Sequence, residues 1–453
     1  MQDPLPITPV GPFDLEVRPP GSKSLLHRAA VAAALAEGES VLTGVDPSED
    51  VVRTLSALHK LGAKVEFNPD TREARIQGAG GTLPGGVTTD PIDLGASGTS
   101  YRLIAAAACV AQGVHTLDGT ARMRQRPIGP LVDALRELGA EIDYLGQRGY
   151  PPLKITGGTI QGGKVKLRDL VSSQFLSALL LIGPGCPEGL ALTFEGDTPS
   201  MPYVRMTVKV MEHFRVRPTS KESSRSGRVR LTVSPDAYYV GRPFDIEPDA
   251  SGASYFLGAG ALVPGSRVVV PGLGSESVQG DAHFADLLGR MGAHVEQRWD
   301  RTLVEAPASG MLRGIDVDLN GMPDMAQTLA VLALFAEGET HLRNIGHLRV
   351  KETDRLDAIA NEVGRLGGDT FILGDDLTVT PPGPDGFTCS ADKPVVIQTY
   401  DDHRMAMAFS LAGLRIPGVQ IQDPGCVAKS YPRYYEDWAR LSEGAVDAAG
   451  TGG

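Results

Sequence analysis

The chain has 453 residues, of which 42% are hydrophobic and 22% charged, as in an ordinary folded protein, and its length suggests about three domains. The net charge of −12 argues against nucleic acid or an acidic membrane surface as a partner. The longest apolar runs, 29–36 and 104–111, are too short to cross a bilayer.

The cysteines and the N-terminus predict a cytoplasmic protein without a metal centre. The four cysteines lie far apart, form no C-x-x-C pair, and therefore suit a reducing compartment rather than a zinc cluster. The N-terminal residues Met-Gln-Asp-Pro-Leu-Pro show no basic region followed by an apolar one, so no signal peptide is expected.

An Ala- and Leu-rich run that follows a hydroxyl or carboxylate residue recurs about every 75 residues. The residues expected to open these runs are Ser24, Thr99, Ser173, Ser251, Asp324 and Asp402. Each run predicts a helix with a capped start, and each ends at a glycine, the usual residue at a helix exit. The runs are apolar almost all round, so these helices must be buried on every side.

A strand-like segment and then an amphipathic helix follow each glycine. In the second repeat, Leu131, Leu135 and Leu138 are spaced as one apolar helix face, and Phe284 with Leu288 continue this pattern in the fourth. The repeating unit is therefore strand, buried helix, strand, amphipathic helix, and a strand or hairpin. The sixth repeat ends early, and we expect the first twenty residues to supply its missing strand.

These six units predict an α/β fold of two domains, because they are too large for a single core. We expect an inside-out α/β barrel in each domain, in which three βαβαββ repeats place buried helices inside and sheets around them. The expected domains are residues 21–245, and residues 1–20 together with 246–453, with an active site in the cleft between them.

The first buried helix begins with the words Pro-Gly-Ser-Lys-Ser. This stretch is not a nucleotide-binding P-loop, because Val17 and Ser22 stand where the loop needs glycines. Lys23, Ser24 and Arg28 instead place two cations and a hydroxyl at a helix start, where free amide groups favour an anion.

The second and third repeats carry further groups suited to an anionic or polyol ligand. Gly98 lets a ligand approach the backbone, and Pro127 restricts the backbone after Arg126. Hydroxyl and amide groups at the third buried helix and its partner helix come from Ser172, Ser173, Gln174 and Ser200. One of these groups would suffice for capping. The fourth repeat has Asp249, Ser251 and Ser254 but no basic residue, and we expect a structural cap there.

The fifth and sixth repeats combine cations with carboxylates. Lys351 and Arg355 are spaced so that they repel each other on a helix unless an anion lies between them. Arg404 and Lys429 come from the sixth repeat, and the carboxylates of Asp324 and Glu352 lie among these cations in the sequence. Together with the cations of the first domain, they predict acid–base chemistry on small, multiply charged molecules.

The sequence resembles the 5-enolpyruvylshikimate-3-phosphate synthase family of the shikimate pathway, which leads through chorismate to the aromatic amino acids. The matching words run in family order from residue 20 to residue 432: PGSKSLLHRA, LGASGTSYR, RMRQRPIG, VSSQFLSALL, SMPYV, DASGASYF, QGDAHFADLL, MPDMA, RVKETDRL, YDDHRMAMA and DPGCVAKSYP. The resemblance implies a two-domain enolpyruvyl transferase, active as a cytoplasmic monomer without a cofactor. Its implied partners are two small molecules, shikimate-3-phosphate and phosphoenolpyruvate.

The same resemblance implies roles for individual residues. Shikimate-3-phosphate would be bound by Lys23, Ser24, Arg28, Ser172, Ser173, Gln174, Ser200, Asp324 and Lys351. Phosphoenolpyruvate would be bound by Lys23, Gly98, Arg126, Gln174, Arg355, Arg404 and Lys429. The catalytic residues would be Lys23, Asp324, which takes the proton of the 5-hydroxyl, and Glu352, which protonates the methylene of phosphoenolpyruvate.

Three residues depart from the pattern of this family. Ala96 and Leu103 replace a common asparagine and a common proline near the expected phosphoenolpyruvate pocket, and they bear on inhibitor sensitivity. His347 replaces an asparagine that often binds shikimate phosphate.

The sequence leaves two alternatives to this function. A UDP-N-acetylglucosamine enolpyruvyl transferase is disfavoured, because such enzymes carry a loop cysteine and none lies between Cys109 and Cys186. A non-catalytic clamshell binder of phosphorylated ligands would not need Asp324 and Glu352 among the cations.

Overall fold

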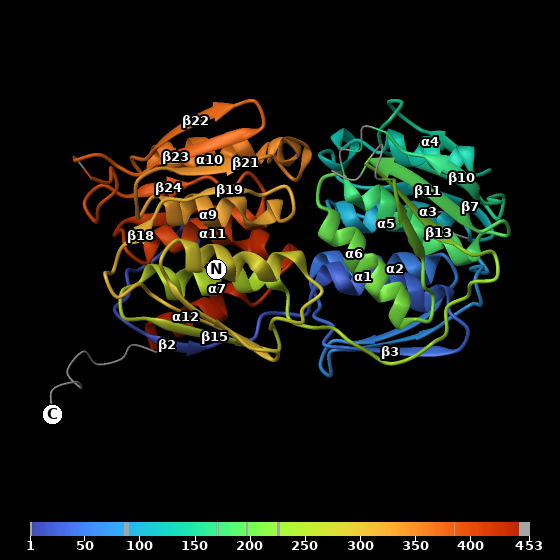
Figure 1. The fold of residues 1–453 in the computed structure, drawn as a ribbon, viewed down its shortest axis with the longest axis horizontal. Helices are drawn as coiled ribbons and strands as arrows, with labels where there is room; N and C mark the ends of the chain where they lie inside the picture. Colours follow the sequence, from blue (N-terminus) through green and yellow to red (C-terminus); the bar gives the residue numbers. More distant parts are fainter. Residues whose placement is uncertain are drawn as a thin grey trace. The chain divides into compact units, whose positions relative to one another are not determined.

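The computed structural model describes residues 2–85, 90–168, 170, 172–195, 198–223, 227–384 and 386–443. The chain divides into a first unit, residues 21–247, and a second unit, residues 1–20 with 248–453 (Figure 1). The boundary, expected after residue 245, falls after Glu247. Among the described residues, no helix is long and apolar enough to cross a membrane.

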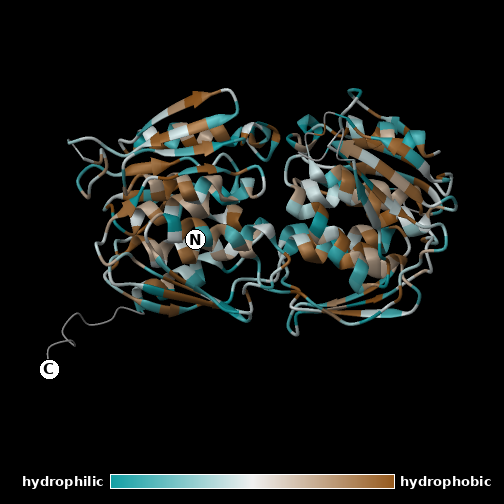
Figure 2. Ribbon diagram, viewed as in Figure 1, coloured by the Kyte–Doolittle hydropathy of each residue, from teal (hydrophilic) through white to brown (hydrophobic). Residues whose placement is uncertain are grey.

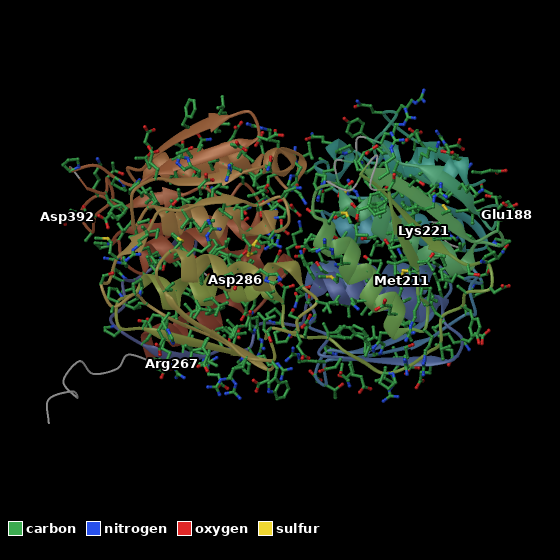
Figure 3. The ribbon with its side chains drawn as sticks, in the orientation of Figure 1. Glu188, Met211, Lys221, Arg267, Asp286 and Asp392 are labelled. Carbon is green, nitrogen blue, oxygen red and sulfur yellow. The ribbon has the colours of Figure 1, made fainter. Side chains whose placement is uncertain are left out.

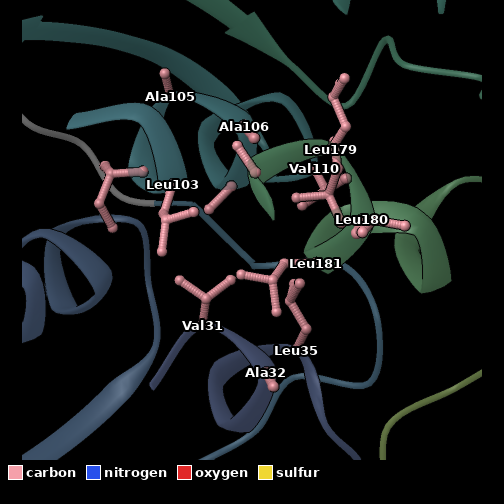
Figure 4. Packing of buried hydrophobic residues seen from close by; sticks show 14 of the residues in the cluster. Val31, Ala32, Leu35, Leu103, Ala105, Ala106, Val110, Leu179, Leu180 and Leu181 are labelled. Carbon is pink, nitrogen blue, oxygen red and sulfur yellow. The ribbon is translucent and has the colours of Figure 1, made fainter. Parts of the chain in front are cut away.

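Three buried helices form the centre of the first unit: α1 (Lys23–Leu35), α3 (Gly98–Cys109) and α5 (Ser173–Ile182). They contact one another, and almost every residue beyond their first turns is buried. Val31 and Leu35 of α1 pack with Leu103 of α3 and Leu181 of α5 (Figure 4). Alanines between these larger side chains let the helix backbones approach closely, which explains why the runs are so rich in alanine.

Four-stranded sheets surround these helices in the described part of the first unit, all with the same pattern of one parallel and two antiparallel pairs. The first repeat contains β14 (Phe244–Asp245), β3 (Glu39–Thr43), β5 (Glu73–Gln77) and β4 (Lys64–Asn68), in that order. The second contains β6 (Ile92–Asp93), β7 (Gly113–Asp118), β9 (Leu153–Gly157) and β8 (Glu141–Tyr144). The third contains β10 (Gly163–Lys166), β11 (Leu190–Glu195), β13 (Arg228–Val233) and β12 (Thr219–Glu222).

The amphipathic helices of the first unit are α2 (Glu49–Lys60), α4 (Gly129–Glu137) and α6 (Met201–His213). The predicted apolar face of the second repeat is confirmed, because Leu131, Leu135 and Leu138 are all buried. Hydrophobic and hydrophilic residues alternate along the strands of the sheets, so one face of each strand lies toward the helices (Figure 2).

The second unit repeats this architecture. Its buried helices are α7 (Ala250–Leu262), α9 (Ala326–Ala333) and α11 (His403–Gly413), which also contact one another. Its outer helices are α8 (Phe284–Arg290), α10 (Arg355–Arg365) and α12 (Tyr434–Glu443). Burial of Phe284 and Leu288 confirms the predicted apolar face of the fourth repeat.

The strands of the fourth and fifth repeats follow the order of those in the first unit. The fourth repeat contains β16 (His294–Gln297), β17 (Arg301–Glu305), β15 (Arg267–Pro271) and β2 (Asp14–Glu16). The fifth contains β19 (Asp316–Asp318), β21 (Thr340–Arg343), β23 (Asp376–Thr380) and β22 (Asp369–Leu373). The sixth contains β1 (Leu5–Pro6), β25 (Val419–Ile421) and β24 (Val395–Ile397), and β18 (Leu312–Arg313) pairs with β20 (Ala336–Glu337).

Segments distant in sequence complete the first and last repeats. β1 pairs antiparallel with β25, which confirms that the first twenty residues supply a strand to the truncated sixth repeat. β2 also comes from this segment and pairs parallel with β15 of the fourth repeat. β14, from the end of the first unit, pairs parallel with β3 of the first repeat. Buried helices inside and sheets outside confirm the predicted inside-out α/β fold.

The predicted helix caps are mostly wrong by one or two residues. The caps of α1, α3, α5 and α7 are Ser22, Ser97, Ser172 and Asp249, not Ser24, Thr99, Ser173 and Ser251. Asp324 lies in the 3-10 turn η4 (Pro323–Met325) before α9, and only Asp402 caps its helix as predicted. Several polar residues lie close together at these starts, so the sequence pattern does not identify which residue leaves the helical backbone.

Candidate active site

Arg28 is a buried cation whose hydrogen-bond partners in the described residues are all neutral. Only 1% of Arg28 is exposed. Its guanidinium donates to the hydroxyls of Thr207 at 2.8 Å and Ser177 at 3.3 Å, and to the backbone carbonyl of Ser24 at 2.7 Å. Burial lowers the pKa of Arg28 to about 10, which leaves it protonated at neutral pH. A buried positive charge among neutral groups favours an anionic ligand.

Lys23 is the first residue of α1, beside a cap residue, Ser22, that makes no side-chain capping bond. The ammonium group of Lys23 forms an ion pair of 2.9 Å with Asp50, which lies in the first turn of α2. This ion pair fixes the lysine at a helix start, where backbone amide groups favour negative charge. Asp50 was not predicted as part of the site.

A buried cluster of polar side chains connects α1, α2 and α3 beneath Lys23. His27 Nδ1 lies 2.9 Å from the hydroxyl of Thr54, and that hydroxyl donates to Ser100 at 2.7 Å. Ser97, the cap of α3, lies 2.6 Å from Ser100. All four side chains are buried. The cluster fixes the starts of α1 and α3 relative to each other through Thr54 of α2.

The starts of α5 and α6 present the predicted neutral donors. Ser172 caps α5 by accepting from the amide of Gln174 at 3.3 Å, and Ser173 is the first residue of that helix. The side-chain amide of Gln174 donates to Thr99 on α3 at 3.1 Å. Ser200 caps α6 with a left-handed φ of 60° and makes no side-chain capping bond.

Gly98 and Arg126 lie against each other at the start of α3. The guanidinium of Arg126 donates to the carbonyl of Ala96 at 3.2 Å, and Arg126 is 4% exposed. A Cβ atom at Gly98 would lie 2.4 Å from Nη2 of Arg126, closer than two such atoms can approach. Glycine is therefore required here so that the arginine can lie over the helix start.

In the second unit, Arg355 connects three carboxylates. It pairs with Asp402 at 2.7 Å, with Asp324 at 2.9 Å and with Glu352 at 3.0 Å, and its side chain is 2% exposed. Burial alone would lower its pKa, but the charges of Asp402, Glu352 and Asp324 outweigh that effect and raise it. Arg355 therefore stays charged, and it holds the carboxylates in fixed directions.

Asp324 also pairs with Arg404, at 2.9 Å. Burial would raise the pKa of Asp324, but the charges of Arg404, Lys351 and Arg355 lower it well below its usual range. Arg404 lies at the start of α11 and also donates to the hydroxyl of Tyr255 at 3.3 Å. An ionised carboxylate therefore lies among cations that could instead bind substrate anions.

Glu352 lies between Arg355 and Lys429. Its carboxylate accepts from Lys429 at 2.9 Å and from Arg355 at 3.0 Å. Lys429 ends the 3-10 segment η6 (Pro424–Lys429), and Lys351 precedes α10 beside Glu352. The structure therefore brings together the predicted carboxylates and cations of the fifth and sixth repeats.

The start of the fourth buried helix has a structural cap, as expected, but the capping residue is Asp249 and not Ser251. The side chain of Asp249 accepts from the amide of Gly252 at 2.8 Å at the start of α7. Beside it, Ser251 donates to Asp281, whose pKa is raised to about 6 by burial and by the charge of Asp324. No cluster of His, Cys, Asp and Glu side chains that could hold a metal ion occurs among the described residues.

The family model described as EPSP synthase (3-phosphoshikimate 1-carboxyvinyltransferase) matches residues 7–438. The chain belongs to this family. A 3-phosphoshikimate 1-carboxyvinyltransferase of Erwinia tasmaniensis is 44% identical over 447 residues, which cover 98% of this chain and 99% of that protein. One of Serratia proteamaculans is 44% identical over 445 residues, which cover 98% and 100%.

Solved structures agree with this assignment. An EPSP synthase from Acinetobacter baumannii has a TM-score of 0.77 and 28% sequence identity, and the match covers 98% of this chain and 99% of that one. The enolpyruvyl transferase NikO from Streptomyces tendae has a TM-score of 0.71 at 19% identity, which shows a shared fold. These likenesses agree with the inside-out α/β architecture seen in each unit.

The predicted residues form two groups that belong to different units. The first unit contributes Lys23, Ser24, Arg28, Gly98, Arg126, Ser172, Ser173, Gln174 and Ser200. The second unit contributes Asp324, Lys351, Glu352, Arg355, Arg404 and Lys429. Sequence reasoning missed the groups that orient these residues: Asp50, Ser177, Thr207, Tyr255 and the pairing of Asp402 with Arg355.

Proposed function

We propose that the chain transfers the enolpyruvyl group of phosphoenolpyruvate to the 5-hydroxyl of shikimate-3-phosphate, releasing phosphate and 5-enolpyruvylshikimate-3-phosphate. The proposal rests above all on the group of Asp324, Glu352, Arg355 and Arg404, in which carboxylates for proton transfer lie within 3.0 Å of buried arginines. Such a group combines acid–base chemistry with recognition of anions.

The proposed shikimate-3-phosphate site centres on Arg28. Its uncompensated charge would be neutralised by the phosphate, with Lys23 adding a second cation. Hydroxyl and amide donors for the rest of the molecule would come from Ser24, Ser172, Ser173, Gln174 and Ser200. Asp324 and Lys351 of the second unit would complete this site.

The proposed phosphoenolpyruvate site uses the arginines that lie at helix starts. Arg355 and Arg404 would bind the substrate from the second unit, with Lys429 beside them. Gly98, Arg126 and Gln174 would bind it from the first unit, and Lys23 would contact both substrates. Arg126 lies directly against Gly98, which supports a site where the backbone of Gly98 and the guanidinium of Arg126 bind the same anion.

The chemistry proceeds by addition and then elimination. Asp324 accepts the proton of the 5-hydroxyl, the oxygen bonds to carbon 2 of phosphoenolpyruvate, and Glu352 gives a proton to carbon 3, which becomes a methyl group. The bond between carbon 2 and the phosphate oxygen then breaks, and the methyl group returns one proton to restore the double bond. Carboxylates near carbon 2 stabilise the positive charge that develops there, and no cofactor takes part.

The low pKa of Asp324 is compatible with its role as a base. Burial would raise this pKa, but the charges of Arg404, Lys351 and Arg355 lower it. Two phosphorylated substrates would offset these charges, so the pKa of Asp324 would rise toward a value at which it accepts a proton efficiently. Substrate binding would thus make Asp324 a more effective base by raising its pKa.

The enzyme is proposed to act as a cytoplasmic monomer. The four cysteines are free thiols, which suit a reducing compartment. Light scattering of the purified protein with and without both substrates measures the oligomeric state directly.

Release of inorganic phosphate tests the proposed function. The purified protein should release phosphate only when shikimate-3-phosphate and phosphoenolpyruvate are both present, in amounts equal to the enolpyruvyl ether formed. Each substrate alone is the control. Phosphate release with UDP-N-acetylglucosamine in place of shikimate-3-phosphate, or tight binding of both substrates without turnover, would contradict the proposal.

A further inference from the structure

Tyr400 and Asp401 have left-handed backbone conformations, with φ of 56° each, directly before the cap of α11. Such a φ is uncommon for residues other than glycine, and it is an outlier for a bulky aromatic residue. Strained residues of this kind persist only where surrounding contacts hold them. They connect β24 to Asp402, which pairs with Arg355.

Glu362, on α10, holds this segment through its buried carboxylate. The hydroxyl of Tyr400 donates to it at 2.7 Å, the backbone amide of Gln398 donates at 3.0 Å, and Arg365 lies 3.2 Å away. The side chain of Glu362 is 0% exposed. Burial raises the pKa of Glu362, while the hydrogen bonds from Tyr400 and Gln398 oppose that rise, so these donors stabilise the ionised form.

Helix α10 therefore contacts both ends of the segment 398–402. Arg355 and Glu362 are seven residues apart on α10, about two helical turns, so they lie on the same face. Arg355 binds Asp402 at one end of the segment, and Glu362 binds Gln398 at the other end and Tyr400 in the middle.

The position of Asp402 determines the directions of two arginines. Its carboxylate accepts from the backbone amide of Arg404 at 2.9 Å and thereby caps α11. The same carboxylate binds the guanidinium of Arg355 at 2.7 Å and 3.2 Å. A displacement of the segment 398–402 would therefore move both arginines that are proposed to bind phosphoenolpyruvate.

We propose that Glu362 and Tyr400 are positioning residues, whose hydrogen bond holds the left-handed segment so that Asp402 orients Arg355 and Arg404 for phosphoenolpyruvate. This inference rests on the proposed function, because it assigns these arginines to that substrate. The side chains of Glu362 and Tyr400 themselves make no proposed contact with substrate.

Steady-state kinetics of Tyr400→Phe test this role, since the variant keeps the ring and removes only the hydroxyl. We expect the KM for phosphoenolpyruvate to rise about tenfold, the size of effect that loss of a hydrogen bond to a charged group produces. The KM for shikimate-3-phosphate should change less than about twofold, because the groups proposed to bind its phosphate are mostly in the first unit. Tyr435→Phe is the matched control: it removes a phenol that lies 3.2 Å from Ser410 on α11, and both KM values should stay unchanged.

Glu362→Gln and the double variant complete the test. Glu362→Gln should raise the KM for phosphoenolpyruvate at least as much as Tyr400→Phe, because it also removes the charge that the amide of Gln398 contacts. The double variant should exceed the larger single effect by less than about twofold, because both changes weaken the hydrogen bond between Tyr400 and Glu362. The inference would be overturned if the single variants lowered thermal stability but left both KM values unchanged, or if both KM values changed equally. It would also be overturned if the change in KM of the double variant equalled the product of the two single changes. If the unaltered protein releases no phosphate from the two substrates, the proposed function itself fails, which is a distinct result.

Discussion

Arg355 binds both carboxylate oxygens of Asp402, from Nε at 2.7 Å and from Nη2 at 3.2 Å. The two side chains are 2% and 0% exposed, and they come from α10 and from the cap of α11. This pairing fixes the plane of the guanidinium, whose other contacts are with Asp324 and Glu352. Arg355 therefore contacts both proposed proton-transfer groups, which Arg404 and Lys429 also hold.

Arg355→Lys should abolish most activity without unfolding the protein. Lysine keeps the charge but cannot form the planar fork that joins Asp402 to two other carboxylates. We expect kcat/KM for phosphoenolpyruvate to fall about 100-fold or more, as when a buried charge network loses its geometry. Steady-state phosphate release measures the change.

Arg267→Lys is the control for that substitution. Arg267 lies on β15, is 42% exposed and pairs with the exposed carboxylate of Asp14 (Figure 3). Its replacement should leave kcat/KM within about twofold, because exposed ion pairs contribute little. Equal losses in the two variants would show that Arg355 acts only through general stability.

Glu352→Gln should bind both substrates but turn over slowly. The amide keeps the size of the side chain but has no acidic proton to deliver to carbon 3, and a general acid contributes about 100- to 10,000-fold to a rate. We expect kcat to fall by that order, while calorimetric Kd values for the substrates change by less than about tenfold.

Glu339→Gln, an exposed position before β21, should leave kcat unchanged. Full turnover by Glu352→Gln would remove Glu352 from its proposed role.

Gly98→Ala should weaken phosphoenolpyruvate binding without destabilising the fold. The added Cβ would lie 2.4 Å from Nη2 of Arg126, so the guanidinium must move. Alanine is a better helix former than glycine, so the thermal midpoint should not fall. We expect the KM for phosphoenolpyruvate to rise about tenfold, equivalent to about 1.4 kcal/mol.

Gly252→Ala provides a comparison, because Gly252 also lies in the first turn of a buried helix, α7, and follows a serine as Gly98 does. A Cβ at Gly252 would meet its nearest neighbours at an ordinary 3.5 Å. The KM should then stay the same, and a rise equal to that of Gly98→Ala would contradict the role given to Arg126.

His27 should make the stability of the first unit depend on pH. Burial lowers the pKa of His27 from 6.5 to about 3, so between these values the unfolded chain binds a proton that the folded chain does not. The free energy of unfolding should therefore fall as pH decreases through this range, and the contribution of His27 should be fully present only above about pH 6.5. At pH 4.5 the loss should reach about 3 kcal/mol.

Urea unfolding at pH 7 and pH 4.5 measures this dependence. His27→Gln should lose less stability than the unaltered protein on acidification, while His59→Gln, at an exposed position on α2, should behave like the unaltered protein. An identical pH dependence in all three proteins would contradict the burial of a neutral His27.

The parts of the architecture that follow from a periodic pattern were predictable from the sequence. Runs such as 104–111 have no polar face, so burial inside the fold was the only stable solution. The contribution of residues 5–6 to the last sheet followed from the missing strand of the sixth repeat. The exact caps did not follow, because Ser22 and Ser24, or Ser97 and Thr99, offer similar chemistry and differ only in backbone geometry.

The candidate site was predictable in its charges but not in its connections. Cations at helix starts, such as Arg355 and Arg404, stood out because a helix start disfavours positive charge. Their partners come from other repeats, as Tyr255 and Asp402 do, and tertiary packing alone decides which of these polar residues meet. Asp402 was predicted as a helix cap, and the structure confirms this. No pattern in the sequence indicates its ion pair with Arg355.

A crystal structure of Glu352→Gln with shikimate-3-phosphate and phosphoenolpyruvate tests the central claim most directly, because the slow variant preserves both substrates. We predict one pair of neighbouring ligands, with Arg28 on the phosphate of shikimate-3-phosphate, Arg355 and Arg404 on phosphoenolpyruvate, and Lys23 contacting both. Ligands that contact residues of only one unit, or that lie away from these arginines, would contradict the account.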